Sequence, residues 1–216
     1  MKRALVLFFI IVSVKSLLVA QVRVPGVTVY KQFKPSTIQL SDGRIIRQPL
    51  TNVFLKNSSL LYMKGSNVMQ ANMKNVKSVT FDDRQYVKID TLLAYRVDSV
   101  GSDALYCATI IDTDAYQRNL KNNRQITSLN LNDVLNSSAD QLSFTSVDIS
   151  NENDFMFPLI DVFFYEYRGK MIRVHERNIL NMLPKEKRTI YKSVISLDSF
   201  SWTNPESLLE LLKRIQ

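Results

Sequence analysis

Three pairs of carboxylates are the residues whose types and spacing come closest to a catalytic or cation-binding pattern. The pairs are Asp82 with Asp83, Asp112 with Asp114, and Glu152 with Asp154. Two carboxylates that converge in a cleft can hydrolyse a glycosidic bond, and sets of carboxylates can bind Ca²⁺. We favour simpler roles, with the first pair in a turn, the second capping a helix and the third in a solvated loop. The sequence therefore predicts no catalytic residue and no metal site.

The single histidine and the single cysteine restrict the chemistry further. A Ser-His-Asp or Cys-His apparatus would have to use His175, and one residue of each type is too few for a zinc site. His175 precedes a helical pattern, so we expect a capping or surface histidine. Cys107 lies in the apolar run 104–111, which predicts a buried and inert thiol. The five glycines form no phosphate-binding pattern, so no cofactor is expected.

Aromatic residues are concentrated in the segment 155–167. An exposed row of rings would form a platform for a glycan or another small ligand. The candidate ligand-binding residues are Phe157, Phe163, Tyr165 and Tyr167. The interpretation we favour is the buried face of a central strand.

The first twenty residues have the pattern of a secretory signal peptide. Lys2 and Arg3 precede the apolar run 4–14, and the small residue Ala20 precedes a polar stretch. Lys15 interrupts the run well before the roughly 20 apolar residues that a membrane span needs. We therefore expect cleavage after Ala20 and export to the periplasm or cell surface. An uncleaved N-terminal anchor is the alternative.

The charge of the mature chain is modest. Without Lys2, Arg3 and Lys15, 25 of the 28 basic residues remain against 20 acidic ones, so the net charge is +5. This charge is spread along the chain, whereas a nucleic-acid-binding protein concentrates it in a patch, so no nucleic-acid partner is expected. No later apolar stretch is long enough to span a bilayer, so no integral membrane span is expected after cleavage.

Residues 37–174 predict an antiparallel β-rich domain. Short apolar runs alternate with turns about every ten residues, and Ser41-Asp42-Gly43 is typical of a hairpin. A sandwich or small barrel is the expected architecture. Residues 21–36 are expected to form an extended leader. A short helix is expected over 112–123, followed by a polar insertion near 124–154.

Residues 175–216 predict a helical segment packed on the β-rich domain, which makes the fold class α+β. The expected helices are 175–183, 185–195 and one that begins at Pro205 after a cap at Thr203 or Asn204. The last helix has an apolar face at helical spacing. We favour packing of this face on the sheet. If it instead contacts another protein, the partner-binding residues are Leu208, Leu209 and Leu212.

Two stretches resemble uncharacterised exported β-rich proteins of the Bacteroidota. The first is the strand-turn-strand pattern of 52–62 together with 76–90. The second is the hairpin 163–174 followed by 180–187, 200–202 and a Leu-rich closing helix. The resemblance covers about half of the chain and includes no catalytic signature. It implies a periplasmic or surface location in a Gram-negative cell.

These observations favour an exported, non-catalytic envelope protein that binds a partner protein or another surface component. The second hypothesis is a small-ligand or glycan-binding protein that uses the aromatic segment 155–167. The third is a carboxylate-based hydrolase. They differ in their structural demands, because a partner-binding module needs an exposed apolar patch or sheet edge, a glycan platform needs exposed rings, and a hydrolase needs convergent carboxylates.

Overall fold

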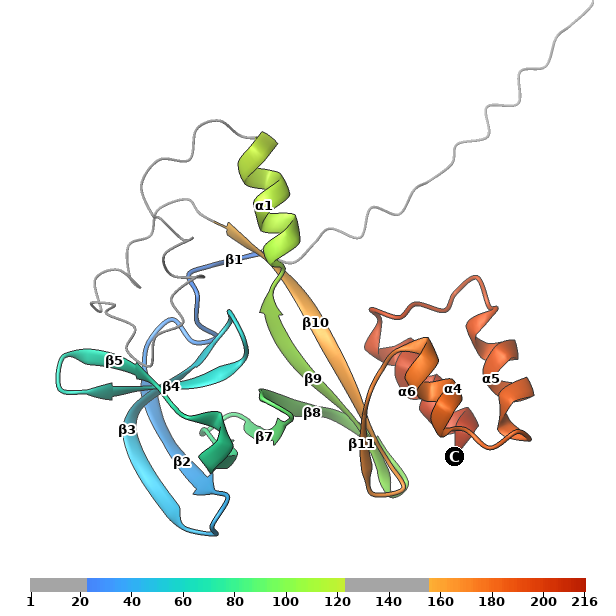
Figure 1. Cartoon of the computed structure of the whole chain (residues 1–216), viewed down its shortest axis with the longest axis horizontal. Coiled ribbons are helices and arrows are strands. Elements are labelled where there is room, and N and C mark those ends of the chain that lie inside the picture. The colour runs from blue at the N-terminus through green and yellow to red at the C-terminus, as the bar shows by residue number, and fades with distance from the viewer. Residues whose placement is uncertain (1–22, 123–155) are drawn as a thin grey trace, which may run out of the picture.

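The computed structural model describes residues 23–122 and 156–216 (Figure 1). The expected signal peptide (1–20) and polar insertion (124–154), with Glu152 and Asp154, lie outside the described residues. The strands are β1 (Arg23–Pro25), β2 (Lys34–Leu40), β3 (Ile45–Phe54), β4 (Ser59–Lys64), β5 (Asn67–Gln70), β6 (Val76–Thr80), β7 (Gln85–Ile89), β8 (Leu92–Val100), β9 (Asp103–Ile111), β10 (Met156–Tyr167) and β11 (Lys170–Arg173). The helices are the 3₁₀ turn η1 (Met73–Asn75), α1 (Thr113–Asn122), α4 (Glu176–Met182), α5 (Lys187–Ile195) and α6 (Pro205–Ile215).

The strands form one antiparallel sheet followed by the C-terminal helices, which confirms the expected α+β class. The order across the sheet is β1-β10-β9-β8-β7-β6-β2-β3-β4-β5, and β11 pairs with β10 on the same edge as β1. The sheet is open, since β1 and β5 lie at its two ends and are not paired with each other, so the small barrel that the sequence allowed as one architecture is not formed. The expected leader, 21–36, contributes β1 and the first residues of β2 to the sheet.

The sheet is strongly curled, so that its two halves approach each other. The loop between β3 and β4 hydrogen-bonds back to the far half: Ile111 donates its amide to the Leu55 carbonyl, and Leu93 donates to the Ser58 carbonyl, both at 2.7 Å. Ser58 has a left-handed backbone with φ of 46°, a conformation that is costly for a residue other than glycine. The loop therefore joins segments that are distant in the sequence.

Local signals in the sequence place the turns and helix ends correctly. Gly43, with φ of 89°, lies in the turn between β2 and β3, as the Asp-Gly pattern predicts. Asp112 accepts a hydrogen bond from the Ala115 amide at 2.8 Å and so begins α1. Asn204 caps α6 by accepting from the Ser207 amide at 3.0 Å. The predicted hairpin and both predicted caps are confirmed.

Helix α6 packs against the sheet through its apolar face. Four of its side chains are fully buried, namely Leu208, Leu211, Leu212 and Ile215. They share one cluster with Tyr165 and Tyr167 of β10, with Tyr191 of α5 and with Cys107 of β9. The favoured interpretation of this helix, packing within the chain, is confirmed, and so is the burial of the cysteine.

Strand β10 is buried on both faces along its C-terminal half, from Val162 onward. Phe163, Tyr165 and Tyr167 face the helices, whereas the alternate residues Val162 and Phe164 belong to a second cluster with residues of β7, β8 and β9. A strand covered on both faces is apolar almost throughout, which explains the dense aromatic sequence. In the described part of the chain, no helix is both long and apolar enough to cross a membrane.

Candidate functional site

The four aromatic candidates of the sequence do not form a binding platform. Phe157, Phe163, Tyr165 and Tyr167 are 0–5% exposed, because neighbouring segments cover them on both sides of the sheet. A glycan platform needs rings on the surface, so this assignment is wrong for these residues. The alternative, a buried strand, is what the structure shows.

The leucines proposed as partner-binding residues are also unavailable at the surface. Leu208 and Leu212 are fully buried beneath α6, and Leu209 is half-buried against the same cluster. A partner could reach the first two only if α6 left the sheet. Their assignment to an external interface is therefore corrected to packing within the chain.

The described carboxylate pairs have structural partners. Lys34 bonds Asp82 at 2.6 Å and Asp83 at 2.8 Å, and the Tyr30 hydroxyl donates to Asp83 at 3.1 Å. The two carboxylates raise the pKa of Lys34. The hydrogen bond from Lys34, with a smaller contribution from Tyr30, lowers the pKa of Asp83. Asp112 caps α1, so Asp82, Asp83 and Asp112 each have the structural partner that the turn and cap interpretations imply.

The histidine and the cysteine have the roles that the sequence indicates. The Nδ1 atom of His175 accepts a hydrogen bond from the Arg177 amide at 3.3 Å and caps α4. The Cys107 thiol is buried, and this burial, with a contribution from Asp161, raises its pKa to about 12. A thiol with so high a pKa is a poor nucleophile at neutral pH. Among the described residues, no cluster of three or more His, Cys, Asp or Glu side chains could hold a metal ion.

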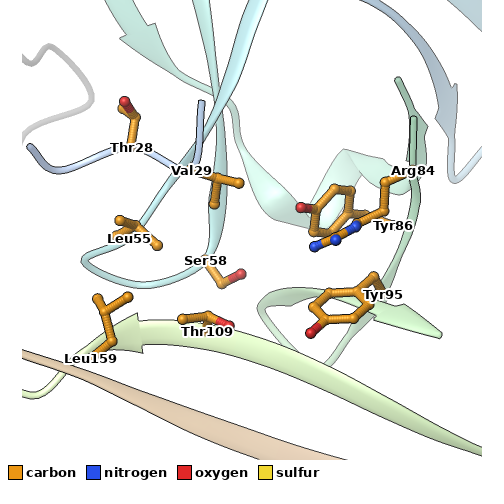
Figure 2. Close-up of a pocket in the computed structure, with 9 residues that line it drawn as sticks. All are labelled: Thr28, Val29, Leu55, Ser58, Arg84, Tyr86, Tyr95, Thr109 and Leu159. Atoms are coloured by element: carbon orange, nitrogen blue, oxygen red, sulfur yellow. The ribbon is translucent and has the colours of Figure 1, made fainter. Parts of the chain in front are cut away.

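The curled sheet encloses a pocket of about 140 Å³ beside the β3–β4 loop (Figure 2). Its lining comes from six separate parts of the chain and comprises Thr28, Val29, Leu55, Ser58, Arg84, Tyr86, Tyr95, Thr109 and Leu159. Figure 2 shows the aliphatic residues Val29, Leu55 and Leu159 on one side and Arg84 with the two tyrosine rings on the other. The pocket therefore has an apolar end and a cationic end.

Arg84 carries the positive charge of this pocket. Its guanidinium lies 4.1 Å from the centre of the Tyr95 ring and next to Tyr86, between the two rings in Figure 2. Burial raises the pKa of both tyrosine hydroxyls, although Arg84 opposes the shift at Tyr86, so both stay neutral. Arg84 forms no ion pair with any carboxylate that the structure describes, since neighbouring Asp83 pairs with Lys34.

Three aliphatic hydroxyls of the pocket, those of Ser58, Thr109 and Thr28, are oriented by hydrogen bonds to the protein. Ser58 donates to the Leu93 carbonyl at 2.6 Å, Thr109 to the Asp161 carboxylate at 2.6 Å, and Thr28 to the Tyr30 carbonyl at 2.9 Å. Each of these three hydroxyl protons is thereby engaged by a carbonyl or carboxylate of the protein. The charged donor at the cationic end is the Arg84 guanidinium, with five N–H groups, beside the hydroxyl-bearing rings of Tyr86 and Tyr95.

A second surface feature is the exposed tip of the β2–β3 hairpin, residues 40–50, which projects away from the helices (Figure 1). Ile45 is 68% exposed, Ile46 42% and Leu50 43%. Along 45–50, β3 pairs with β2 on one side, and no described strand pairs with its other edge, because β4 begins its pairing at Thr51. The tip thus combines exposed aliphatic side chains with an open strand edge.

Neither feature is among the sites that the sequence predicts. Arg84 directly follows the Asp82-Asp83 pair, and the nine pocket residues share no spacing. The Asp-Gly turn predicts the hairpin, but it does not indicate that Ile45 and Ile46 are exposed. The signal that could have drawn attention to the tip is the run of two adjacent isoleucines directly after an Asp-Gly turn.

Comparison of the chain with protein-family models, with curated proteins and with solved structures finds no match in any of the three.

Proposed function

We propose that this is an exported, non-catalytic envelope protein that binds a partner protein through the tip of its β2–β3 hairpin. The observation that carries the proposal is the exposure of Ile45, Ile46 and Leu50 within six residues of one open-edged strand. Isolated exposed aliphatic residues are ordinary, but a group of them on one projecting element is typical of an interaction surface.

The chemistry of the tip favours a protein partner over a glycan. Glycan recognition relies on aromatic faces and polar side chains, whereas the exposed apolar residues here are aliphatic. An open strand edge can accept a strand of another chain, with the backbone supplying hydrogen bonds and the side chains supplying specificity. Pro49 lacks an amide proton and limits such pairing to the segment between the turn and residue 48.

The proposed location rests on the N-terminal pattern and on the resemblance to exported proteins of the Bacteroidota. Fractionation of the source cells should recover the protein in the periplasmic or outer-membrane fraction. N-terminal sequencing of that material should begin at or near Gln21. Recovery in the cytoplasm with Met1 retained would contradict export.

Site-specific photo-crosslinking in intact cells tests the binding surface. A photoreactive amino acid at Ile45 should give one dominant adduct with an envelope protein. The same amino acid at Leu197, which is 56% exposed in the loop after α5, is the matched control and should not give that adduct. A triple Ile45→Thr, Ile46→Thr, Leu50→Thr variant should lose the interaction, because threonine retains strand propensity but removes the aliphatic surface.

Three results would contradict the proposal: equal adducts from both positions, no adduct from Ile45, or an unchanged interaction in the triple variant. An adduct between two copies of this chain would show that the tip mediates self-association and does not bind a different protein. Circular dichroism of the triple variant should be unchanged, since all three side chains are exposed.

A further inference from the structure

We propose that the pocket beside the β3–β4 loop binds a small monocarboxylate with a compact apolar body. The carboxylate would pair with Arg84, and the apolar body would lie against Val29, Leu55 and Leu159. The inference is independent of the hairpin tip, because no residue of 40–50 lines this pocket.

The size of the pocket limits the ligand. A cavity of about 150 Å³ in another protein holds one benzene molecule, so a pocket of about 140 Å³ suits a ring or branched chain of that size. A larger apolar body would protrude from the open side of the pocket into solvent, because the loop at Leu55 and Ser58 is fixed by hydrogen bonds to β8 and β9.

The charge at one end selects an anion. Arg84 has no carboxylate partner among the described residues, and its stacking on Tyr95 holds the guanidinium beside the pocket. A guanidinium matches a carboxylate through two parallel hydrogen bonds. A phosphate ester would carry more charge than one arginine neutralises and would lie against three aliphatic side chains, so a monocarboxylate fits better.

The pocket also contains backbone strain. Ser58 has a φ of 46° and is kept there by two hydrogen bonds with Leu93, one through its carbonyl and one through its hydroxyl. Strained residues of this kind are concentrated at binding sites, where the surrounding structure compensates their cost. The strain supports a pre-formed pocket that needs little rearrangement to accept a ligand.

Titration with benzoate, followed by NMR of the purified protein, tests the proposal. Benzoate should bind with a Kd between about 0.01 and 1 mM, and the largest amide shifts should fall at Thr28, Val29, Leu55 and Ser58. Benzamide, which has the same shape without the charge, should bind at least about tenfold more weakly.

Two arginine variants give a matched comparison. Arg84→Gln should weaken benzoate binding at least about tenfold and abolish the preference over benzamide. Arg96→Gln removes another exposed arginine, in β8, that does not line this pocket, and this variant should bind benzoate as the unmodified protein does. Val29→Phe should fill the apolar end of the pocket and weaken the binding of both benzoate and benzamide.

Several results would overturn the inference. They are the absence of benzoate binding at concentrations up to about 10 mM, equal binding of benzoate and benzamide, or an equal loss in both arginine variants. Shifts centred outside the pocket would also overturn it. The triple threonine variant of the hairpin tip should retain benzoate binding, so failure of one proposal is distinguishable from failure of the other.

Discussion

The hydroxyl of Tyr165, in strand β10, donates a 2.6 Å hydrogen bond to the carbonyl oxygen of Leu208 in helix α6. Two residues further along the strand, the hydroxyl of Tyr167 donates to the carbonyl of Ile215 at 3.0 Å. Both bonds are buried, and each joins a strand to a helix more than forty residues later in the chain. They fix the position of α6 along the strand, beyond what apolar packing alone specifies.

The first prediction concerns these hydroxyls. Tyr165→Phe should lower the free energy of unfolding by about 1 kcal/mol, because it removes a buried hydrogen bond while preserving the ring. Urea denaturation, with the midpoint lowered and the slope unchanged, measures the effect.

Tyr191→Phe is the matched control for that substitution. Its hydroxyl is buried in the same cluster and has no hydrogen-bond partner among the described residues. Removing it should leave the stability unchanged or raise it slightly, since no bond is lost. If Tyr191→Phe lowered the free energy of unfolding more than Tyr165→Phe, the hydrogen bond from Tyr165 to Leu208 would be contradicted.

The second prediction compares the loss of stability at a fully buried and at a half-buried leucine of α6. Leu212→Ala should destabilise the protein by about 2–5 kcal/mol, because it leaves a cavity in a fully buried site. Leu209→Ala, at a half-buried site, should cost clearly less. Equal and small effects would show that α6 does not pack on the sheet as described, and thermal unfolding of both variants provides the comparison.

The third prediction concerns the loop that closes the curl of the sheet. Ser58→Ala should cost about 1–3 kcal/mol, because the buried Leu93 carbonyl loses the hydroxyl that donates to it. Ser58→Gly should cost less than the alanine variant, since glycine adopts a φ of 46° without steric strain. The opposite order in chemical denaturation would argue against strain at this position.

The fourth prediction is a pH dependence. The pKa of Asp83 is lowered in the folded protein, mainly by Lys34, so its contribution is complete above the ordinary pKa of about 4. It is lost as the pH falls through the lowered folded value, because the unfolded chain binds the proton first. The contribution should stay below about 1 kcal/mol, since the pair is exposed to solvent.

The measurement is the melting temperature between about pH 6 and pH 2. Asp83→Asn should lose less stability over this range than the unmodified protein. In a Lys34→Gln background, the same substitution should have no further effect on the pH dependence. If Asp83→Asn still changed the pH dependence in the Lys34→Gln background, a group other than Lys34 would cause the pKa shift of Asp83.

The fifth prediction concerns the thiol of Cys107. Because burial raises its pKa to about 12, labelling by an aromatic disulfide reagent at pH 8 should be slow in the folded protein. In denaturant, one thiol per chain should react rapidly. Rapid labelling under native conditions would contradict the burial of β9 beneath the helices.

Features that depend on neighbouring residues could be predicted from the sequence. The cap at Asn204, the helix start at Asp112 and the turn at Gly43 each arise from backbone and side-chain groups within about four residues of one another. The same holds for the apolar face of α6, because helical periodicity places its leucines on one side. The helix boundaries and the antiparallel hairpins were therefore predicted correctly.

The apolar run around Cys107 indicated a buried thiol, whereas the aromatic segment favoured a buried strand but left the exposure of its rings open. Alternation along a strand shows which residues share a face, but both faces of β10 carry aromatic side chains. Only the packing of α6 on one face and of neighbouring strands on the other decided that none of the four candidate rings is exposed.

The tertiary structure alone decided where the pocket and the exposed tip lie. The pocket residues come from segments as distant as Thr28 and Leu159, and they meet because the sheet curls until the loop at Ser58 bonds to β8 and β9. Curling and strand order result from long-range packing summed over the whole sheet, which no local pattern encodes. For the same reason, the exposure of Ile45 and Ile46 follows from the projection of their hairpin beyond the strands that cover the rest of the sheet.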